Sequence, residues 1–161
     1  MNDLTHDDVA ALLSYDPETG ALTWKVSRGT VKAGDVAGRG NGHGYRQIGV
    51  KGRSYLAHRL AFLLMTGKWP TLFVDHLNGQ RDDNRWSNLR EASNEINQQN
   101  ITQAQKNSAT GLLGVVPFRG RFKAQITANG QNRHLGTYDS AEVAHAVYVA
   151  AKRLLHEGNT L

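Results

Sequence analysis

The chain of 161 residues carries a net charge of +5 at pH 7 and contains no cysteine, which excludes disulfides and cysteine-ligated zinc sites. This length accommodates one domain or two small ones. The N-terminal residues lack the features of a secretory signal and no apolar run approaches the ~20 residues of a membrane span, so we expect a soluble, cytoplasmic protein without a membrane partner.

The first predicted elements are a helix and a strand joined by a turn. Apolar residues recur at helical spacing within residues 7–15, after acidic residues that suit the start of a helix. Residues 16–20 have the composition of a turn. Residues 21–25 alternate between apolar and polar side chains, which predicts a strand.

A glycine-rich segment and a hairpin come next. Residues 28–44 combine many glycines with Arg and Lys, which predicts an exposed loop or a disordered segment. Residues 45–50 and 54–56 flank the turn Lys51-Gly52-Arg53 and predict a hairpin. The helix that follows, residues 59–67, is almost wholly apolar and should form the core of the first domain.

The middle of the chain predicts a buried strand, a polar loop and a second helix. Residues 72–74 form a short apolar strand that runs into an Asp-His pair, and residues 78–87 form a polar loop. Ser93 is a candidate N-cap, which predicts a helix over residues 94–105.

The last third of the chain predicts three strands and one helix. Residues 122–127 alternate as a strand does, the Asn-Gly pair at 129–130 indicates a type I′ turn, and residues 133–135 begin the next strand. Ser140 is a candidate N-cap for a helix whose apolar stripe should pack on the sheet. That stripe consists of Val143, Ala146, Val147, Ala150, Ala151, Leu154 and Leu155.

The residues best suited to chemistry are Asp75, His76, Asn88 and Asn97. A carboxylate, an imidazole and two carboxamides within 23 residues can assemble a metal-dependent nuclease centre. Asp75 and Asn97 offer oxygen ligands that suit one Mg²⁺ or Mn²⁺ ion, which a single carboxylate should bind weakly without DNA. A neutral His76 could take a proton from the attacking water as general base, so activity should fall as the solution becomes acidic.

The sequence around these four residues resembles the HNH family of endonucleases. The resemblance rests on three short runs, Asp75–Gly79, Asp82–Arg85 and Asn88–Ala92. It implies an α+β fold whose first domain, residues 1–104, contains a ββα-metal core at about 71–104, in which a two-stranded hairpin packs on one helix around a single divalent ion. It also implies that Asn88 ties the hairpin loop to the backbone beside His76 and so orients the imidazole.

Two interpretations of this site stay open. Neighbouring residues of a flat strand point to opposite faces, so Asp75 and His76 can share a site only if the strand bends or ends there. In the purely structural alternative, His76 caps the strand and Asp75 pairs with Arg81 or Arg85.

Basic residues of the N-terminal hairpin and of the apolar helix that follows it are candidates for contacts with the DNA backbone. Arg59 could hold a phosphate through its bidentate fork, whereas its neighbour His58 is expected to pack under the hairpin. Arg46 and Arg53 in the N-terminal hairpin are further candidates, although an ordinary solvated face explains them almost as well.

The last third also carries most of the excess positive charge, with seven Lys/Arg and three Asp/Glu in residues 105–161. A localised positive surface favours polyanions through release of phosphate counterions, and a merely soluble basic face is the alternative. If Phe122, Ala124, Ile126 and Leu135 face the helix, strand alternation places a polar ridge on the open face of the sheet, where it could enter the major groove. The ridge consists of Arg121, Lys123, Gln125, Thr127, Asn132 and His134, with Arg119, Arg121 and Arg133 as candidate phosphate contacts.

This region resembles the ethylene-response-factor (Apetala-type) DNA-binding domain of plants. The resemblance rests on Gly114-Val115, residues 122–126 and residues 135–144. It implies a small three-stranded antiparallel sheet packed on one helix, residues 110–161, after a linker at 105–109. Val116 replaces the usual basic residue, His134 replaces an aromatic one and the first strand turn is a residue shorter, so plant target sequences should not be transferred.

Together these features predict a phage-type or mobile-element-type HNH endonuclease that acts on double-stranded DNA in the cytoplasm of a bacterial host. One rival is a sequence-specific DNA-binding regulator with an inert nuclease fold. Another is a ribonuclease or RNA-binding protein, for which the sheet lacks an aromatic stacking platform. A monomer should nick one strand whereas a homodimer could cut both, and no dimerisation stripe in the sequence decides between them.

Overall fold

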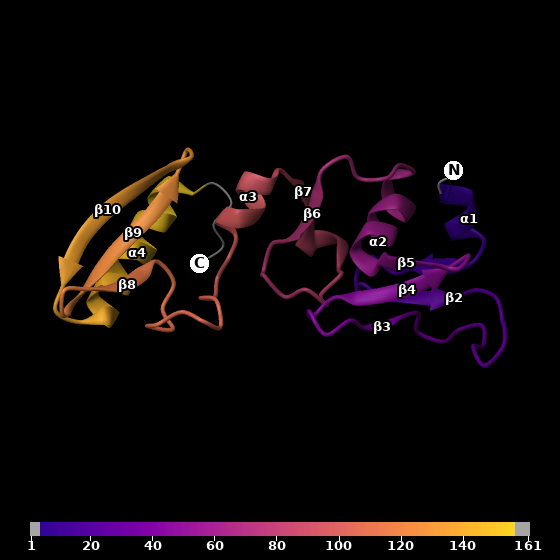
Figure 1. Ribbon diagram of the computed structural model, residues 1–161. Coiled ribbons are helices and arrows are strands. Elements are labelled where there is room, and N and C mark those ends of the chain that lie inside the picture. Colours follow the sequence, from indigo (N-terminus) through magenta and orange to yellow (C-terminus); the bar gives the residue numbers. More distant parts are fainter. Residues whose placement is uncertain (1–3, 157–161) are drawn as a thin grey trace. The chain divides into compact units, whose positions relative to one another are not determined.

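The computed structural model describes residues 4–156. The chain divides into two compact units, Met1–Ser93 and Asn94–Leu161 (Figure 1). Each unit is a mixture of short helices and small antiparallel sheets. Among the residues that the structure describes, no helix has the length and apolar character needed to cross a membrane.

The division between the units falls earlier in the chain than the predicted linker at 105–109. The segment after Ser93 belongs to the second unit, where it is fastened by a buried cation. The side chain of Lys152 is 1% exposed, and its ammonium group donates a hydrogen bond to the backbone carbonyl of Ile101. A buried ammonium needs such an acceptor, so this contact ties the segment down.

The first unit opens with a short helix and a hairpin. Its elements are α1 (His6–Ala10), β1 (Leu13–Tyr15) and β2 (Leu22–Trp24). Thr5 and Asp8 cap α1 reciprocally, each side chain accepting a hydrogen bond from the other residue's backbone N–H. The predicted helix over residues 7–15 is wrong beyond Ala10, because the last three residues pair with β2 and bury Leu13.

A three-stranded sheet and a helix complete the core of this unit. Its elements are β3 (Arg39–Gly40), β4 (Arg46–Val50), β5 (Arg53–Leu56) and α2 (Ala57–Thr66). The predicted hairpin is confirmed, with Lys51 and Gly52 at φ values of 48° and 76°, the left-handed turn that joins twisted strands well. The predicted apolar helix is confirmed as α2, which contacts β4 and β5 and buries Leu60 and Leu63.

The third part of the first unit is a long hairpin. Its strands are β6 (Phe73–His76) and β7 (Leu89–Ala92), paired antiparallel, and the 3-10 helix η1 (Trp86–Asn88) lies at the end of the loop between them. The loop is polar, as predicted. Strand β6 also contacts α2, so the hairpin is packed on the core.

The second unit begins with a short helix and continues as a sheet with one long helix. Its elements are α3 (Asn94–Gln99), β8 (Val115–Phe118), β9 (Arg121–Ala128), β10 (Gln131–Tyr138) and α4 (Ala141–Leu155). Helix α3 ends well before the predicted limit of 105, because the Asn, Thr and β-branched residues that follow are poor helix formers. The antiparallel sheet has the order β10-β9-β8 and packs on α4, as predicted.

The predicted inward face of this sheet is confirmed, whereas the predicted stripe of α4 is correct only in part. Val147, Ala151 and Leu155 are partly buried, but the other four residues of the stripe are exposed. Ala124 and Ile126 are buried on the sheet. On α4 the buried side chains are Ala144, Tyr148 and Lys152, each four residues from the next, while Val143 and Leu154 of the predicted stripe are 51% and 85% exposed. An aromatic ring and a long aliphatic stem fill this interface better than the smaller apolar residues one position away.

Gly114 packs directly against the ring of Tyr148, and Gly114→Val should destabilise the second unit. A Cβ atom at Gly114 would lie 2.0 Å from the ring of Tyr148, and φ is 76°, so we expect a loss of about 3 kcal/mol. Gly111→Val is the matched control, because its φ is 66° but no atom lies within 4 Å. Hydrogen exchange at the β9 amides measures the difference, and equal losses for the two variants would contradict the packing argument.

Candidate active site

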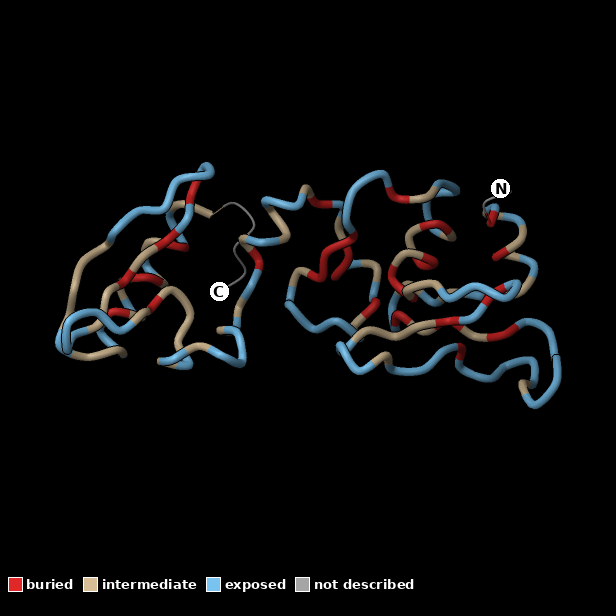
Figure 2. Tube along the Cα trace, in the orientation of Figure 1, coloured by how far each residue is buried: buried red, intermediate tan, exposed pale blue. Residues whose placement is uncertain are grey.

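Strand β6 places Asp75 and His76 side by side in the chain, and both are buried, with 6% and 3% of their surface exposed (Figure 2). The strand ends at His76, and both residues are still paired with β7, so their sharing of one site stays a prediction. Asp75 lies opposite Arg90 and His76 opposite Leu89. The two side chains therefore leave the hairpin on opposite faces and meet different partners.

Asp75 forms an ion pair across the hairpin. Its Oδ2 accepts hydrogen bonds from Nη2 of Arg90 at 3.0 Å and from Nε at 3.3 Å. The structural alternative named Arg81 or Arg85 as the partner, and the structure shows Arg90 instead. Arg85 pairs with Asp83 at 2.6 Å, whereas Arg90 directly faces Asp75 in the strand register.

The imidazole of His76 lies in a cluster of rings. Its centroid is 4.9 Å from that of His58, with the rings edge to face at 89°, and 6.0 Å from that of Tyr45. Nε2 lies 3.2 Å from Oδ1 of Asn84. Burial lowers the pKa of His76 below its usual range, and the hydrogen bond to Asn84 and the charge of Asp75 oppose this only in part. The ring is therefore neutral at pH 7, the state that a general base requires.

His58 packs under the hairpin, where the sequence placed it. It is 4% exposed, and its Nδ1 has no hydrogen-bond partner within the described residues. Burial is the main cause that lowers the pKa of His58 to about 3, and the neighbouring His76 and Arg59 add to the effect. His58 is thus a neutral ring that packs edge to face against His76.

Asn88 and Asn84 hold the loop between the strands. Oδ1 of Asn88 accepts from the backbone N–H of Asn78 at 2.9 Å, and its Nδ2 donates to the carbonyl of Asp83 at 2.7 Å. This is the tie to the backbone near His76 that the resemblance implied. Asn84, which the sequence analysis did not single out, touches the His76 ring itself. Its position in the run Asp82–Arg85 was the only available signal.

A family model described as HNH endonuclease matches residues 55–99, from β5 through α3. The chain contains an HNH endonuclease domain. No curated protein and no solved structure matches the chain. The predicted HNH resemblance is confirmed over this segment and supports a nuclease, while the resemblance of the C-terminal unit to the ethylene-response-factor domain stays a prediction.

The metal-binding part of the HNH prediction depends on residues of both units. Asp75 belongs to the first unit, whereas Asn97 lies on α3 of the second, so the ββα-metal arrangement stays a prediction. Within residues 4–156 no three His, Asp or Glu side chains are grouped so that they could hold a metal ion. The donor chemistry nevertheless fits Mg²⁺ or Mn²⁺, because hard cations prefer carboxylate and carboxamide oxygens.

Two arginines predicted to contact DNA near the HNH domain already have protein partners. Arg59 donates to the carbonyl of Pro70 at 3.3 Å, and Arg46 donates to that of Gly38 at 3.1 Å. Arg53 is exposed. The two bonded guanidinium groups brace the backbone, and a further role at the phosphates stays a prediction for all three residues.

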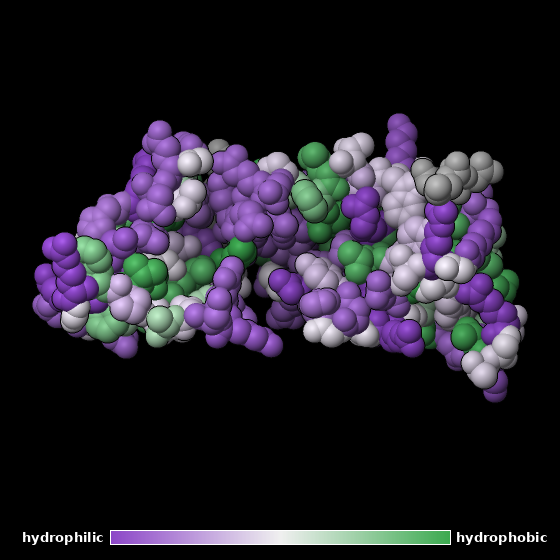
Figure 3. All heavy atoms as spheres, viewed as in Figure 1, coloured by the Kyte–Doolittle hydropathy of each residue, from purple (hydrophilic) through white to green (hydrophobic). Residues whose placement is uncertain are grey.

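The ridge predicted on the C-terminal sheet does share one face. Register pairs His134 with Gln125 and Asn132 with Thr127, and Lys123 lies on the same side of β9. The Lys123 ammonium lies 5.7 Å from the ring of Phe118. Polar residues thus line the side of the sheet away from α4, and hydrophilic side chains surround small apolar areas on the view of this unit in Figure 3.

The arginines at this sheet differ in their surroundings. Arg121 donates to Asp139 at 2.6 Å, and Arg119 lies over Phe118 at 5.3 Å from the ring centroid. Arg133 is exposed but lies opposite Ile126, so it belongs to the other face of the strand pair. Its predicted role as a phosphate contact, unlike that of the ridge, requires a side chain that reaches around the edge of the sheet.

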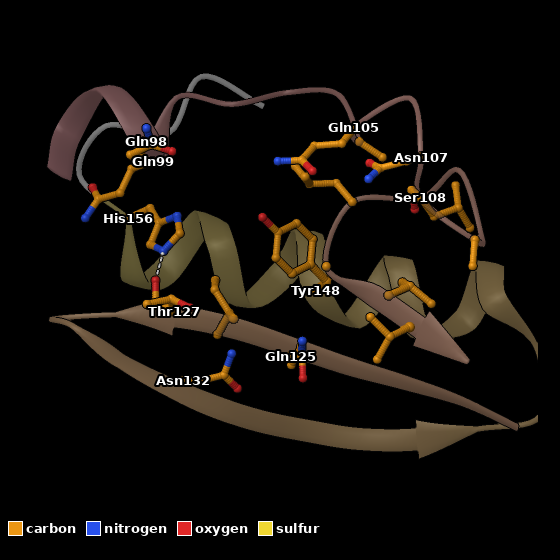
Figure 4. A pocket seen from close by; sticks show the side chains of 18 of the residues that line it. Gln98, Gln99, Gln105, Asn107, Ser108, Gln125, Thr127, Asn132, Tyr148 and His156 are labelled. Atoms are coloured by element: carbon orange, nitrogen blue, oxygen red, sulfur yellow. Dashed lines mark hydrogen bonds between the residues drawn. The ribbon is translucent and has the colours of Figure 1, made fainter. Parts of the chain in front are cut away.

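The second unit also contains a hollow of about 1230 Å³. Figure 4 shows Tyr148 and His156 among the side chains that line this hollow. Nε2 of His156 lies 2.8 Å from the backbone carbonyl oxygen of Thr127. Both carboxamide and apolar side chains line the hollow, and none of the described residues that line it is Lys or Arg. The carboxamides labelled there are Gln98, Gln99, Gln105, Asn107, Gln125 and Asn132. The lining includes the acidic Glu95, and a carboxylate does not attract phosphate, so the basic end of the ridge is the better candidate for DNA.

Proposed function

We propose that this protein is a metal-dependent HNH endonuclease of the phage or mobile-element type that hydrolyses phosphodiester bonds in duplex DNA. The observation that carries the proposal is the HNH match over residues 55–99, which encloses a buried Asp75 and a buried, neutral His76 at the end of β6. His76 is the general base. Asp75 and Asn97 are the protein ligands for one Mg²⁺ or Mn²⁺ ion.

Each proposed site residue of the HNH domain has one task in this reaction. Hydrolysis needs an activated water and neutralisation of the charge that develops on the phosphate. His76 removes a proton from the water, and Asn88 holds the loop that carries the site. When bound at Asp75, the divalent ion supplies the positive charge at the phosphate. By family resemblance the products carry a 5′ phosphate and a 3′ hydroxyl.

The proposed role of the C-terminal unit is to position the enzyme on DNA. We expect Lys123→Ala to weaken binding to duplex DNA and to reduce the slope of log affinity against log salt by about 0.9, the value for one phosphate contact. Arg153→Ala is the matched control, because Arg153 is an exposed cation on α4. Fluorescence anisotropy across a salt series measures both slopes. An unchanged slope for Lys123→Ala would remove this residue from the DNA-binding face.

Cleavage of supercoiled plasmid tests the proposed function directly. We expect conversion to nicked or linear DNA with Mg²⁺ or Mn²⁺ and none with chelator. The ratio of nicked to linear product separates single-strand nicking from cutting by a homodimer. Competition by duplex DNA and by RNA separates a DNA enzyme from a ribonuclease.

An inert DNA-binding regulator is the second candidate, and one observation favours it. The carboxylate of Asp75 is already paired with Arg90, which competes with a metal ion for the same oxygen. A protein that binds duplex DNA without metal and never cuts it, on plasmid and on bacterial genomic DNA, would support this candidate.

A further inference from the structure

We propose that Asn84 is a positioning residue that fixes the tautomer of His76, so that Nδ1 is the nitrogen that takes the proton from water. The inference rests on the proposed function for its catalytic meaning. Its structural content, the position of one hydrogen on the ring, can be measured without any reaction.

The hydrogen bonds of Asn84 determine which nitrogen of His76 carries hydrogen. Nδ2 of Asn84 donates to the carbonyl of Asp82 at 3.1 Å, which turns Oδ1 toward His76 Nε2 at 3.2 Å. A carboxamide oxygen only accepts, so Nε2 is the donor. A neutral imidazole has one N–H, and its lone pair is therefore on Nδ1.

Asn84 is braced by a distant part of the chain. Its side chain is buried, and its backbone carbonyl accepts a hydrogen bond from the hydroxyl of Tyr15 at 2.7 Å. The turn after β1 approaches so closely that a Cβ atom at Gly20 would lie 2.5 Å from the carbonyl carbon of Asn84. The carboxamide therefore has a fixed position from which to hold the imidazole.

The neighbouring rings restrict the imidazole further. His58 packs edge to face against it, and Tyr45 covers another side. Rotation of His76 away from Asn84 would break its hydrogen bond and disturb both contacts. In the proposed reaction the water gives one proton to Nδ1, leaving an imidazolium whose Nε2–H still donates to Asn84. The resulting hydroxide attacks phosphorus as the bond from phosphorus to the 3′ oxygen breaks, and the departing 3′ oxygen takes a proton from solvent to become the 3′ hydroxyl.

The position of the hydrogen is tested by NMR on protein labelled with ¹⁵N-histidine. The His76 signals are assigned by their loss in His76→Gln, and long-range proton–nitrogen spectra at neutral pH report the tautomer. We expect the Nε2–H form in the wild type and in Asn84→Asp, which keeps an acceptor oxygen. We expect a mixture in Asn84→Leu, and the wild-type pattern in Gln80→Leu, which alters an exposed carboxamide of the same loop. The Nδ1–H form in the wild type, or an unchanged tautomer in Asn84→Leu, would overturn the assignment.

Single-turnover cleavage supplies the catalytic test. We expect Asn84→Leu to cut about 10²-fold more slowly at unchanged DNA affinity, with partial recovery in Asn84→Asp. A tautomer change without any loss of rate would contradict the role of Nδ1. A wild type that holds the Nε2–H form but never cuts DNA would contradict the proposed function and leave the role of Asn84 in fixing the tautomer confirmed.

Discussion

His76→Ala should lower the rate of DNA cleavage by about 10²- to 10⁴-fold while duplex DNA still binds, because general-base catalysis contributes a factor of this size. Burial keeps the wild-type ring neutral, so it can accept a proton at pH 7. Single-turnover cleavage of plasmid measures the rate, and fluorescence anisotropy with chelator present measures binding.

Two controls accompany His76→Ala, one for the loss of side-chain volume and one for the removal of a histidine elsewhere. Alanine leaves a gap beside His58 and Tyr45, so His76→Gln, which fills more of the space, should show the same loss of rate. His43→Ala removes an exposed histidine of the glycine-rich loop and should retain full activity. If His76→Gln and His76→Ala cut as fast as the wild type, His76 is a structural residue that caps the strand.

Asp75→Asn should lower metal-dependent cleavage by about 10²-fold or more, since the charge that a bound divalent ion stabilises in the transition state is worth several kcal/mol. The amide keeps the shape of the carboxylate but loses its negative charge, so the ion is held less tightly. Arg90 also loses its anionic partner. Cleavage across a Mn²⁺ series measures the rate and the metal requirement together.

Direct metal binding separates the two effects of Asp75→Asn. Electron paramagnetic resonance of Mn²⁺ with uncleavable duplex DNA should show weaker binding in Asp75→Asn and in Asn97→Ala. Asp82→Asn, which neutralises an exposed acid of the same loop, should bind as the wild type does. Undiminished Mn²⁺ binding in Asp75→Asn would show that the ion pair with Arg90, and not a metal, is the role of this carboxylate.

The sequence by itself determined the elements whose signals lie within a few residues. The turn at Lys51-Gly52 and the Asn-Gly turn at 129–130 fixed two hairpins, because only residues that accept a positive φ close such turns. Ser140 fixed the start of α4 through its hydroxyl, which accepts from the N–H of Val143. The HNH segment was likewise recognisable, since its characteristic residue types and spacing lie within one short stretch of the chain.

Tertiary structure alone decided which partners these residues meet. Leu13 pairs in a strand although its spacing is helical, because β2 returns alongside it. The buried face of α4 follows the shape of the sheet beneath Tyr148 and not the count of apolar residues.

The candidate site shows the same division between local pattern and distant contact. Asp75 and His76 were evident from their types, but Arg90 as the partner of Asp75 follows from the strand register, 15 residues along the chain. Asn84 lies beside His76 with its backbone held by Tyr15, which is 69 residues away in the chain. Local propensity acts over a turn or a single strand, whereas the position of a side chain is set by packing between segments that the sequence does not place together.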